Sequence, residues 1–186
     1  MSGLSGTVVE IGAGYGATFA LYSASVRQVI ALESEPGLRR RAKDAAAQLK
    51  VPIRVQARWA GRTLLPDASA DAVVSSLVLC SVADQGVVLA EALRVLRPGG
   101  IFAFYEHEHE HEHEHEHEHV RAGSRLLGRV EDLLTPVWGV AAGGCHPNRD
   151  TVASITTAGF DVESVRRFGF SVLPGVPVIA HVIGRA

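Results

Sequence analysis

Residues 8–16 read Val8-Val9-Glu10-Ile11-Gly12-Ala13-Gly14-Tyr15-Gly16, and this stretch is the most informative part of the sequence. Its β-branched residues predict a short buried strand, and its alternating glycines predict a tight turn. Residues 17–22 predict the first turns of a helix that ends near residues 23–25. Glycine lets the main chain turn sharply and lie against a ligand, and a helix start presents unpaired N–H groups. The stretch therefore predicts a site for a nucleotide-like cofactor that carries an anionic group.

A second buried strand over residues 27–32 ends at Glu33, about 20 residues after the glycines. A carboxylate at the tip of this strand can accept hydrogen bonds from both hydroxyls of a ribose, each contributing about 1.5–3 kcal/mol. The alternative is a solvated strand-end carboxylate, or a capping partner for the helix that begins at Pro36. We favour ribose binding, although the loop and Glu33 together do not identify the nucleotide.

The composition predicts one globular domain, because 186 residues with 47% apolar side chains suffice for a single core. No apolar run reaches the length of a membrane span, and no leader with a cleavage site opens the sequence. Cys80 and Cys145 fit neither a disulfide framework nor a zinc site. We therefore expect a cytoplasmic protein with no membrane span and no metal site.

The net charge of −2 hides an uneven distribution, since seven glutamates lie in one repeat and the rest of the chain carries +5. Positive charge on this modest scale forms no stripe with interleaved aromatic residues. We expect a small-molecule partner and no nucleic acid.

Alternating helix and strand patterns continue along the chain. Helices are predicted over residues 36–49, 85–96, 121–138 and 149–158, the last capped by Asn148. Strands are predicted over residues 51–55, 72–76, 101–105, 160–170 and 176–184.

Three motifs make a resemblance specific: Glu10-x-Gly12-x-Gly14-x-Gly16, Ser76-Leu-Val-Leu-Cys-Ser-Val82 and Arg94-Val-Leu-Arg-Pro-Gly-Gly100. Together they resemble the class I S-adenosylmethionine-dependent methyltransferases of the methyltransferase-11 and ubiquinone-biosynthesis-type group. The nearest branch is the methyltransferase-like one associated with alkyl-thiol methylation. The resemblance covers residues 7–185. It implies a single domain with an α/β, Rossmann-like doubly wound sheet of seven mostly parallel strands and a C-terminal antiparallel strand pair.

The resemblance also implies S-adenosylmethionine as cofactor and a set of residues that bind it. That set comprises Glu10, Gly12, Ala13, Gly14, Gly16, Glu33, Ser34, Ala60 and Ser76. Two departures stand out. Trp59 and Gly61 occupy positions where relatives commonly place an acidic residue against adenine, so Trp59 either stacks on adenine or packs in the core. The helical segment that usually precedes the first strand is missing from residues 1–7.

Seven consecutive Glu-His units, residues 106–119, follow the fifth predicted strand, where relatives carry one such pair. We interpret the repeat as an expanded, solvated low-complexity insertion, with adventitious metal binding as an alternative. One unit, either Glu106-His107 or Glu118-His119, is also expected at the catalytic mouth, because ligands bind at the carboxyl ends of parallel strands.

Candidate catalytic bases are therefore Glu106, His107, His119 and His146, the last beside Cys145 in what we favour as a structural turn. His181 is interpreted as a core histidine. The sequence predicts methyl transfer to a small molecule, and the resemblance implies an alkyl thiol as the acceptor. The alternatives are a non-catalytic S-adenosylmethionine-binding remnant and an NAD-dependent oxidoreductase, although the Arg-Pro-Gly-Gly block disfavours the latter.

Overall fold

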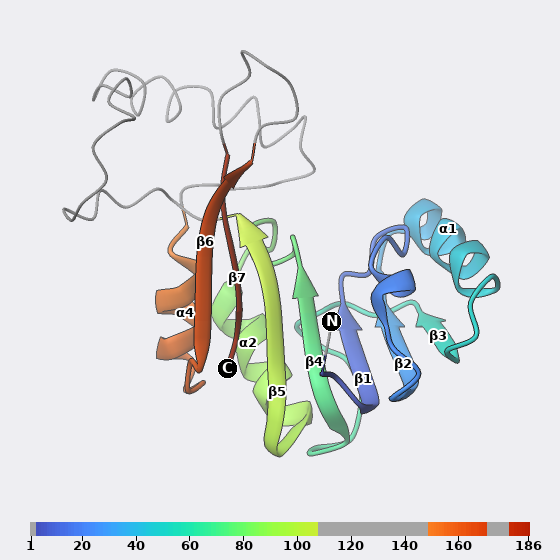
Figure 1. Cartoon of the computed structure of the whole chain (residues 1–186), viewed down its shortest axis with the longest axis horizontal. Helices are drawn as coiled ribbons and strands as arrows, with labels where there is room; N and C mark the ends of the chain where they lie inside the picture. The colour runs from blue at the N-terminus through green and yellow to red at the C-terminus, as the bar shows by residue number, and fades with distance from the viewer. Residues whose placement is uncertain (1–2, 108–148, 171–178) are drawn as a thin grey trace.

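A computed structural model describes residues 3–107, 149–170 and 179–186. Its seven strands form one sheet in the order β3-β2-β1-β4-β5-β7-β6 (Figure 1). The strands are β1 (Gly6–Ile11), β2 (Val26–Leu32), β3 (Ile53–Gln56), β4 (Ala70–Ser76), β5 (Leu96–His107), β6 (Ser164–Phe170) and β7 (Ile179–Arg185). The first five strands run parallel, and β7 pairs antiparallel with both β5 and β6. The predicted fold class is confirmed.

The described helices are α1 (Pro36–Ala46), α2 (Gln85–Val95) and α4 (Thr151–Thr157), with a 3₁₀ turn η1 at Phe19–Leu21. Figure 1 shows α2 and α4 together on one face of the sheet and α1 beside β2 and β3. Alternate residues of a strand point to opposite faces, so each face has its own core. One core holds Val9, Ile11, Leu32, Val88, Leu89, Phe102 and Ile155. The other holds Val8, Phe19, Tyr22, Val29, Ala42, Ala72 and Val74.

The prediction of a helix at residues 17–22 is wrong, because the segment makes a single 3₁₀ turn. Tyr22 already has an extended backbone, so the helical conformation does not continue into Ser23-Ala24-Ser25. Thr18 and Tyr22 also direct their hydroxyls to Glu10, which holds the turn in this form. The glycine loop is therefore followed by one 3₁₀ turn and not by the predicted helix.

Several predicted boundaries also shift. The helix predicted over residues 36–49 ends at Ala46, and the strand predicted to begin at residue 101 begins at Leu96, which pairs with Ala70. Asp150, and not Asn148, caps α4, because its carboxylate accepts a hydrogen bond from Ala153 N at 2.8 Å. The predicted helix at residues 121–138 lies outside the described residues, as do His119, Cys145, His146, Asn148 and the Glu-His units after the first.

Candidate active site

The carboxyl ends of β1, β2, β4 and β5 lie along one edge of the sheet, as parallel neighbours must. The glycine loop follows β1, Glu33 follows β2, and Leu77 follows β4. Glu106 and His107 are the last two residues of β5. The sheet thus brings together at one edge the motifs that the sequence separates by almost 100 residues.

The glycine loop has three residues with positive φ: Gly12 at 60°, Gly14 at 57° and Gly16 at 86°. A Cβ on Gly12 would lie 2.5 Å from Val78 Cγ2, and one on Gly16 would lie 2.7 Å from the Phe19 ring. At Gly14, by contrast, no atom of the described residues lies within 4 Å of the Cβ position. Packing therefore requires glycine at the two outer positions, whereas Gly14 borders open space in which a ligand can lie against the main chain.

Glu33 joins the glycine loop to the start of α1. Its Oε2 accepts a hydrogen bond from Gly14 N at 2.8 Å, and its Oε1 accepts one from Glu35 N at 2.7 Å. Its exposed fraction is 7%. A carboxylate offers about four lone-pair sites, so Glu33 retains acceptor capacity on both oxygens. Glu35, and not Glu33, caps α1, with its Oε1 accepting from Gly37 N at 2.9 Å.

The Glu10 carboxylate binds two hydroxyl groups of the segment that follows the glycine loop. It accepts hydrogen bonds from Tyr22 Oη at 2.6 Å and from Thr18 Oγ1, and it is buried. Burial raises the pKa of Glu10 above its usual value, and the two hydroxyl bonds oppose that rise. In this structure Glu10 anchors the segment that follows the glycine loop, and its contact with a cofactor stays a prediction.

Glu106 and His107 point to opposite faces of β5 because they are adjacent in a strand. Glu106 is fully buried and accepts hydrogen bonds from Ser75 Oγ at 2.6 Å, Val78 N at 3.1 Å and Cys80 N at 3.3 Å. Burial raises the pKa of Glu106, and the bond from Ser75 is the largest opposing influence. Its carboxylate is enclosed by β4 and the loop after it.

His107 is partly exposed, and its ring packs edge-on against His181, with the ring centroids 4.6 Å apart. His181 is buried, as predicted, and stacks on Tyr105 at 5.3 Å and on Phe168 at 5.7 Å. Sequence reasoning missed these aromatic neighbours. The available signal was the two-residue alternation on each strand, but the pairing register that brings the strands together is not visible in the sequence.

Comparison with known proteins identifies the family of this chain. Residues 9–104 match the family described as Methyltransferase domain. The thiol S-methyltransferase TMT1B of Rattus norvegicus is 32% identical over 183 residues, which cover 97% of this chain and 70% of the rat protein. The human TMT1B is 32% identical over 191 residues, covering 100% of this chain and 73% of the human protein.

This chain belongs to the class I S-adenosylmethionine-dependent methyltransferases. Its methyl donor is S-adenosylmethionine. The fold agrees, since the YcgJ protein of Bacillus subtilis superimposes with a TM-score of 0.72 at 14% identity, covering 97% of this chain and 90% of that one.

The residues of the methyltransferase fit the cofactor. The open space at Gly14 leaves room for a group against the main chain, and the spare lone pairs of Glu33 suit ribose hydroxyls. Trp59 is 48% exposed, which contradicts the alternative that it packs in the core. Its ring lies over Gly61, where a Cβ would approach it to 2.5 Å. Trp59 is therefore accessible for stacking on an adenine.

The other proposed cofactor contacts vary in exposure. Ala13 and Ala60 are buried, with 6% and 7% exposed. Ala13 N donates to Leu32 O at 2.9 Å, which joins the glycine loop to the end of β2. Ser34 is exposed and Ser76 is half-buried. Their contacts with the cofactor remain predictions.

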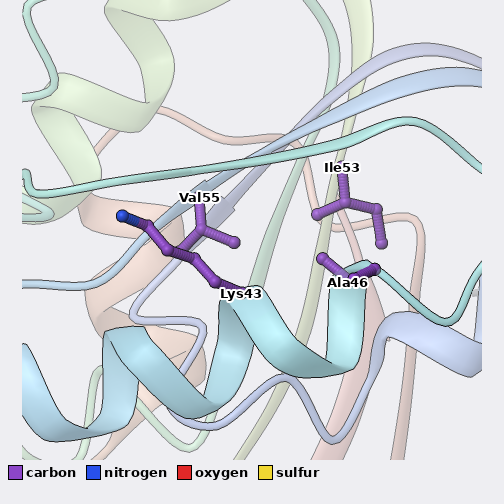
Figure 2. A pocket seen from close by; sticks show the side chains of 5 residues that line it. Lys43, Ala46, Ile53 and Val55 are labelled. Carbon is purple, nitrogen blue, oxygen red and sulfur yellow. The ribbon is translucent and has the colours of Figure 1, made fainter.

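A separate hollow lies between α1 and β3 (Figure 2). It is lined by Lys43, Ala46, Ala47, Ile53 and Val55. These residues lie on the outer helix and the edge strand, so the hollow is distinct from the site at the strand ends. Within residues 3–107, 149–170 and 179–186, no group of three or more His, Cys, Asp or Glu side chains is placed to hold a metal ion.

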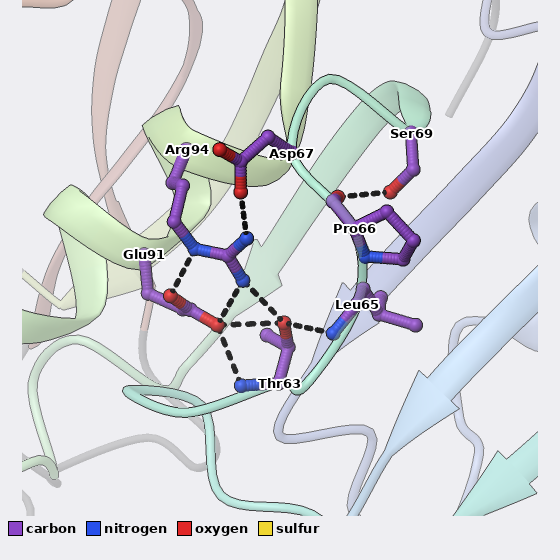
Figure 3. Close-up of polar contacts among 7 residues, drawn as sticks. All are labelled: Thr63, Leu65, Pro66, Asp67, Ser69, Glu91 and Arg94. Carbon is purple, nitrogen blue, oxygen red and sulfur yellow. Dashed lines mark hydrogen bonds and ion pairs between the residues drawn. The ribbon is translucent and has the colours of Figure 1, made fainter.

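A polar network ties the loop before β4 to α2 (Figure 3). Glu91 Oε1 accepts from Thr63 N and Thr63 Oγ1, both at 2.7 Å, and Arg94 binds Glu91 and Asp67. The bond from Arg94 is the largest influence that lowers the pKa of Glu91 to about 2. The network holds the segment between the third and fourth strands that also carries Trp59.

Among the described helices, none is long and apolar enough to cross a bilayer.

Proposed function

We propose that this methyltransferase transfers the methyl group of S-adenosylmethionine to the sulfur of a small alkyl thiol. The relatives support a thiol acceptor, because proteins named thiol S-methyltransferases are 32% identical over almost the whole chain. The observation that carries the chemistry is the place of His107, a partly exposed imidazole at the carboxyl end of β5, on the same sheet edge as the glycine loop.

The donor, when bound, supplies a methyl group already activated by the sulfonium. The chain has to bind and orient the two substrates and remove a proton from the thiol. Free thiols have a pKa near ~8.5, so only a few per cent are ionised at neutral pH. His107 would accept the thiol proton, and the thiol sulfur would then take the methyl group from the bound donor, with S-adenosylhomocysteine as the leaving product.

The acceptor side offers a surface suited to an apolar molecule. Tyr105 and Phe168 are half-buried and lie near His107 through His181. Stacked rings present apolar faces that an alkyl chain can contact without leaving a polar group unpaired. His119 and His146 lie outside the described residues and stay alternative bases.

The test is an assay of S-methyl product and S-adenosylhomocysteine formation from short alkyl thiols, with the matching alcohols and amines as comparison acceptors. We expect turnover with thiols. His107→Gln should lower kcat/KM about 10²-fold near neutral pH, with a smaller loss above the thiol pKa, where the acceptor is already ionised. His109→Gln, in the next repeat unit, is the matched control and should retain parental activity.

Transfer to amines but not thiols would contradict the thiol assignment. Binding of S-adenosylhomocysteine without transfer to any acceptor would favour the non-catalytic remnant. An unchanged pH profile in His107→Gln would exclude His107 as the base.

A further inference from the structure

The first glutamate of the Glu-His repeat is built into the fold. Glu106 belongs to β5, its side chain is 0% exposed, and its three described donors all come from β4 and the loop that follows it. Glu106 Oε1 accepts from both Ser75 and Val78, and Oε2 accepts from Cys80. These hydrogen bonds fix the position of the buried carboxylate, and they also fix the positions of the groups that donate to it.

The loop that Glu106 holds has a conformation that needs support. Leu77 has φ of 57°, a left-handed backbone conformation that is strained for a residue with a side chain, and its N–H donates to Tyr105 O at 2.7 Å. The next residues form a turn in which Ser81 N donates to Val78 O at 2.8 Å. A strained backbone of this kind persists only when surrounding contacts fix its conformation. Glu106 supplies two of these contacts, because it accepts hydrogen bonds from Val78 N and Cys80 N.

The loop of residues 77–80 also packs against the glycine loop. Val78 is buried, and its Cγ2 lies 2.5 Å from the position a Cβ would take on Gly12. The side chain of Val78 therefore packs directly on the main chain at Gly12. A shift of Val78 would displace the main chain at Gly12, because the two residues are closely packed.

We propose that Glu106 is a positioning residue, which fixes residues 77–80 through its buried carboxylate and, through Val78, sets the glycine loop at Gly12 for the cofactor. This deepens the proposed function and rests on it for the reaction served. It separates the roles within the first unit: Glu106 positions the loop and His107 faces the acceptor side. It also reassigns Glu106 from the candidate bases, because its carboxylate is enclosed by donors of its own chain.

The primary test measures amide hydrogen exchange by NMR in the parent and in Glu106→Gln, with no cofactor present. Glutamine keeps the size of the side chain but replaces one acceptor oxygen with an NH₂ group that cannot accept. We expect exchange at Val78 and Cys80 to rise at least tenfold, while Val29 in β2, bonded to Pro52 O, stays unchanged. Glu112→Gln, three units further along the repeat, is the matched control and should leave all three amides unchanged.

Calorimetry with S-adenosylhomocysteine adds a second readout. We expect a Kd about tenfold higher in Glu106→Gln, with residual kcat and an unaltered pH profile. Ser75→Ala, which removes one donor and keeps the carboxylate, should raise exchange at Val78 and Cys80 only a few-fold. This milder variant keeps the test decisive if Glu106→Gln folds poorly.

Three results would overturn the proposal. Unchanged exchange at Val78 and Cys80 would show that Glu106 does not hold the loop. Equal acceleration at Val29 would show a general loss of stability. Abolished turnover with unchanged cofactor affinity and an altered pH profile would return Glu106 to the role of base. The exchange measurement needs no acceptor, so a chain that shows the expected exchange but methylates no thiol would refute the acceptor assignment and leave the positioning role intact.

Discussion

Glu33 and Glu106 are both strand-end carboxylates that bind a neighbouring loop, but they differ in how far their own chain encloses them. Each carboxylate lies at the carboxyl end of a parallel strand and accepts hydrogen bonds from main-chain N–H groups of a nearby loop. Glu33 makes two such bonds and is 7% exposed, whereas Glu106 accepts three bonds and is 0% exposed. One partner of Glu33 is Gly14, which borders open space.

We propose that this difference separates a carboxylate that binds the cofactor, Glu33, from one that holds the fold, Glu106. Both hold a loop, but Glu33 keeps lone pairs on the side of the cofactor loop, while Glu106 is enclosed by β4 and residues 77–80. On this proposal, the role depends on the number of internal donors and on the remaining exposure, because the residue type is the same.

Removing each carboxylate should separate the two roles most strongly. Glu106→Ala leaves two buried N–H groups and a hydroxyl without their acceptor, each costing about 1–3 kcal/mol, so the free energy of unfolding should fall by about 3 kcal/mol or more. Glu33→Ala should cost about 1 kcal/mol, because water can reach its donors. Urea unfolding of both variants provides the comparison, and equal losses would contradict the assigned difference.

The glycine loop gives the next contrast. Gly12→Ala places a Cβ against Val78 at a positive φ and should lower the free energy of unfolding by about 2–3 kcal/mol. Gly14→Ala meets no described atom within 4 Å, so only its positive φ, about 1 kcal/mol, should count. Thermal unfolding should rank the two variants in this order. The cofactor affinity of Gly14→Ala should nevertheless fall about tenfold, because the new methyl group occupies ligand space.

Glu10 extends the comparison to a third buried strand-end carboxylate. Tyr22→Phe removes one of its two described hydrogen bonds and should cost about 1.5 kcal/mol, since bonds to a charged acceptor are worth about 1.5–3 kcal/mol. Tyr15→Phe, at a ring that is 50% exposed, is the control and should change stability little. Equal denaturation midpoints for the two variants would show that the Glu10 contact carries no stability.

The smallest effect concerns Glu91, whose pKa is about 2 in the folded state against a usual value of 4.5. A lowered pKa means that the ionised form stabilises the fold, so its contribution is present above about pH 4.5 and is lost as the pH falls toward 2. Because Arg94 is partly and Asp67 largely exposed to solvent, we expect the ionised Glu91 to contribute only about 1 kcal/mol to the free energy of unfolding. The difference in unfolding free energy between the parent and Glu91→Gln should narrow over this pH window. A constant difference would contradict the assignment.

Features with local causes could be predicted from the sequence. The strand of Val8, Val9 and Ile11, the glycine turn and the acidic tip at Glu33 depend on periodicity and backbone freedom, which short stretches reveal. The fold class followed from these features together with the motif resemblance.

Features that depend on distant partners could not be predicted. His107 meets His181 because β5 and β7 pair in one antiparallel register, and Glu106 meets Val78 because β4 lies beside β5. Neither contact leaves a pattern in either segment alone. The 3₁₀ turn at Phe19–Leu21 was missed for the same reason, since the hydroxyls of Thr18 and Tyr22 bind Glu10 eight and twelve residues away.

The most direct test of the account is a calorimetric titration of the parent and Glu33→Ala with S-adenosylhomocysteine, using NAD as the comparison ligand. We expect the parent to bind S-adenosylhomocysteine selectively and Glu33→Ala to bind it about 10- to 100-fold more weakly, a loss of about 1.4–2.7 kcal/mol. Equal affinity in the two proteins would contradict the central claim that Glu33 holds the cofactor at the glycine loop.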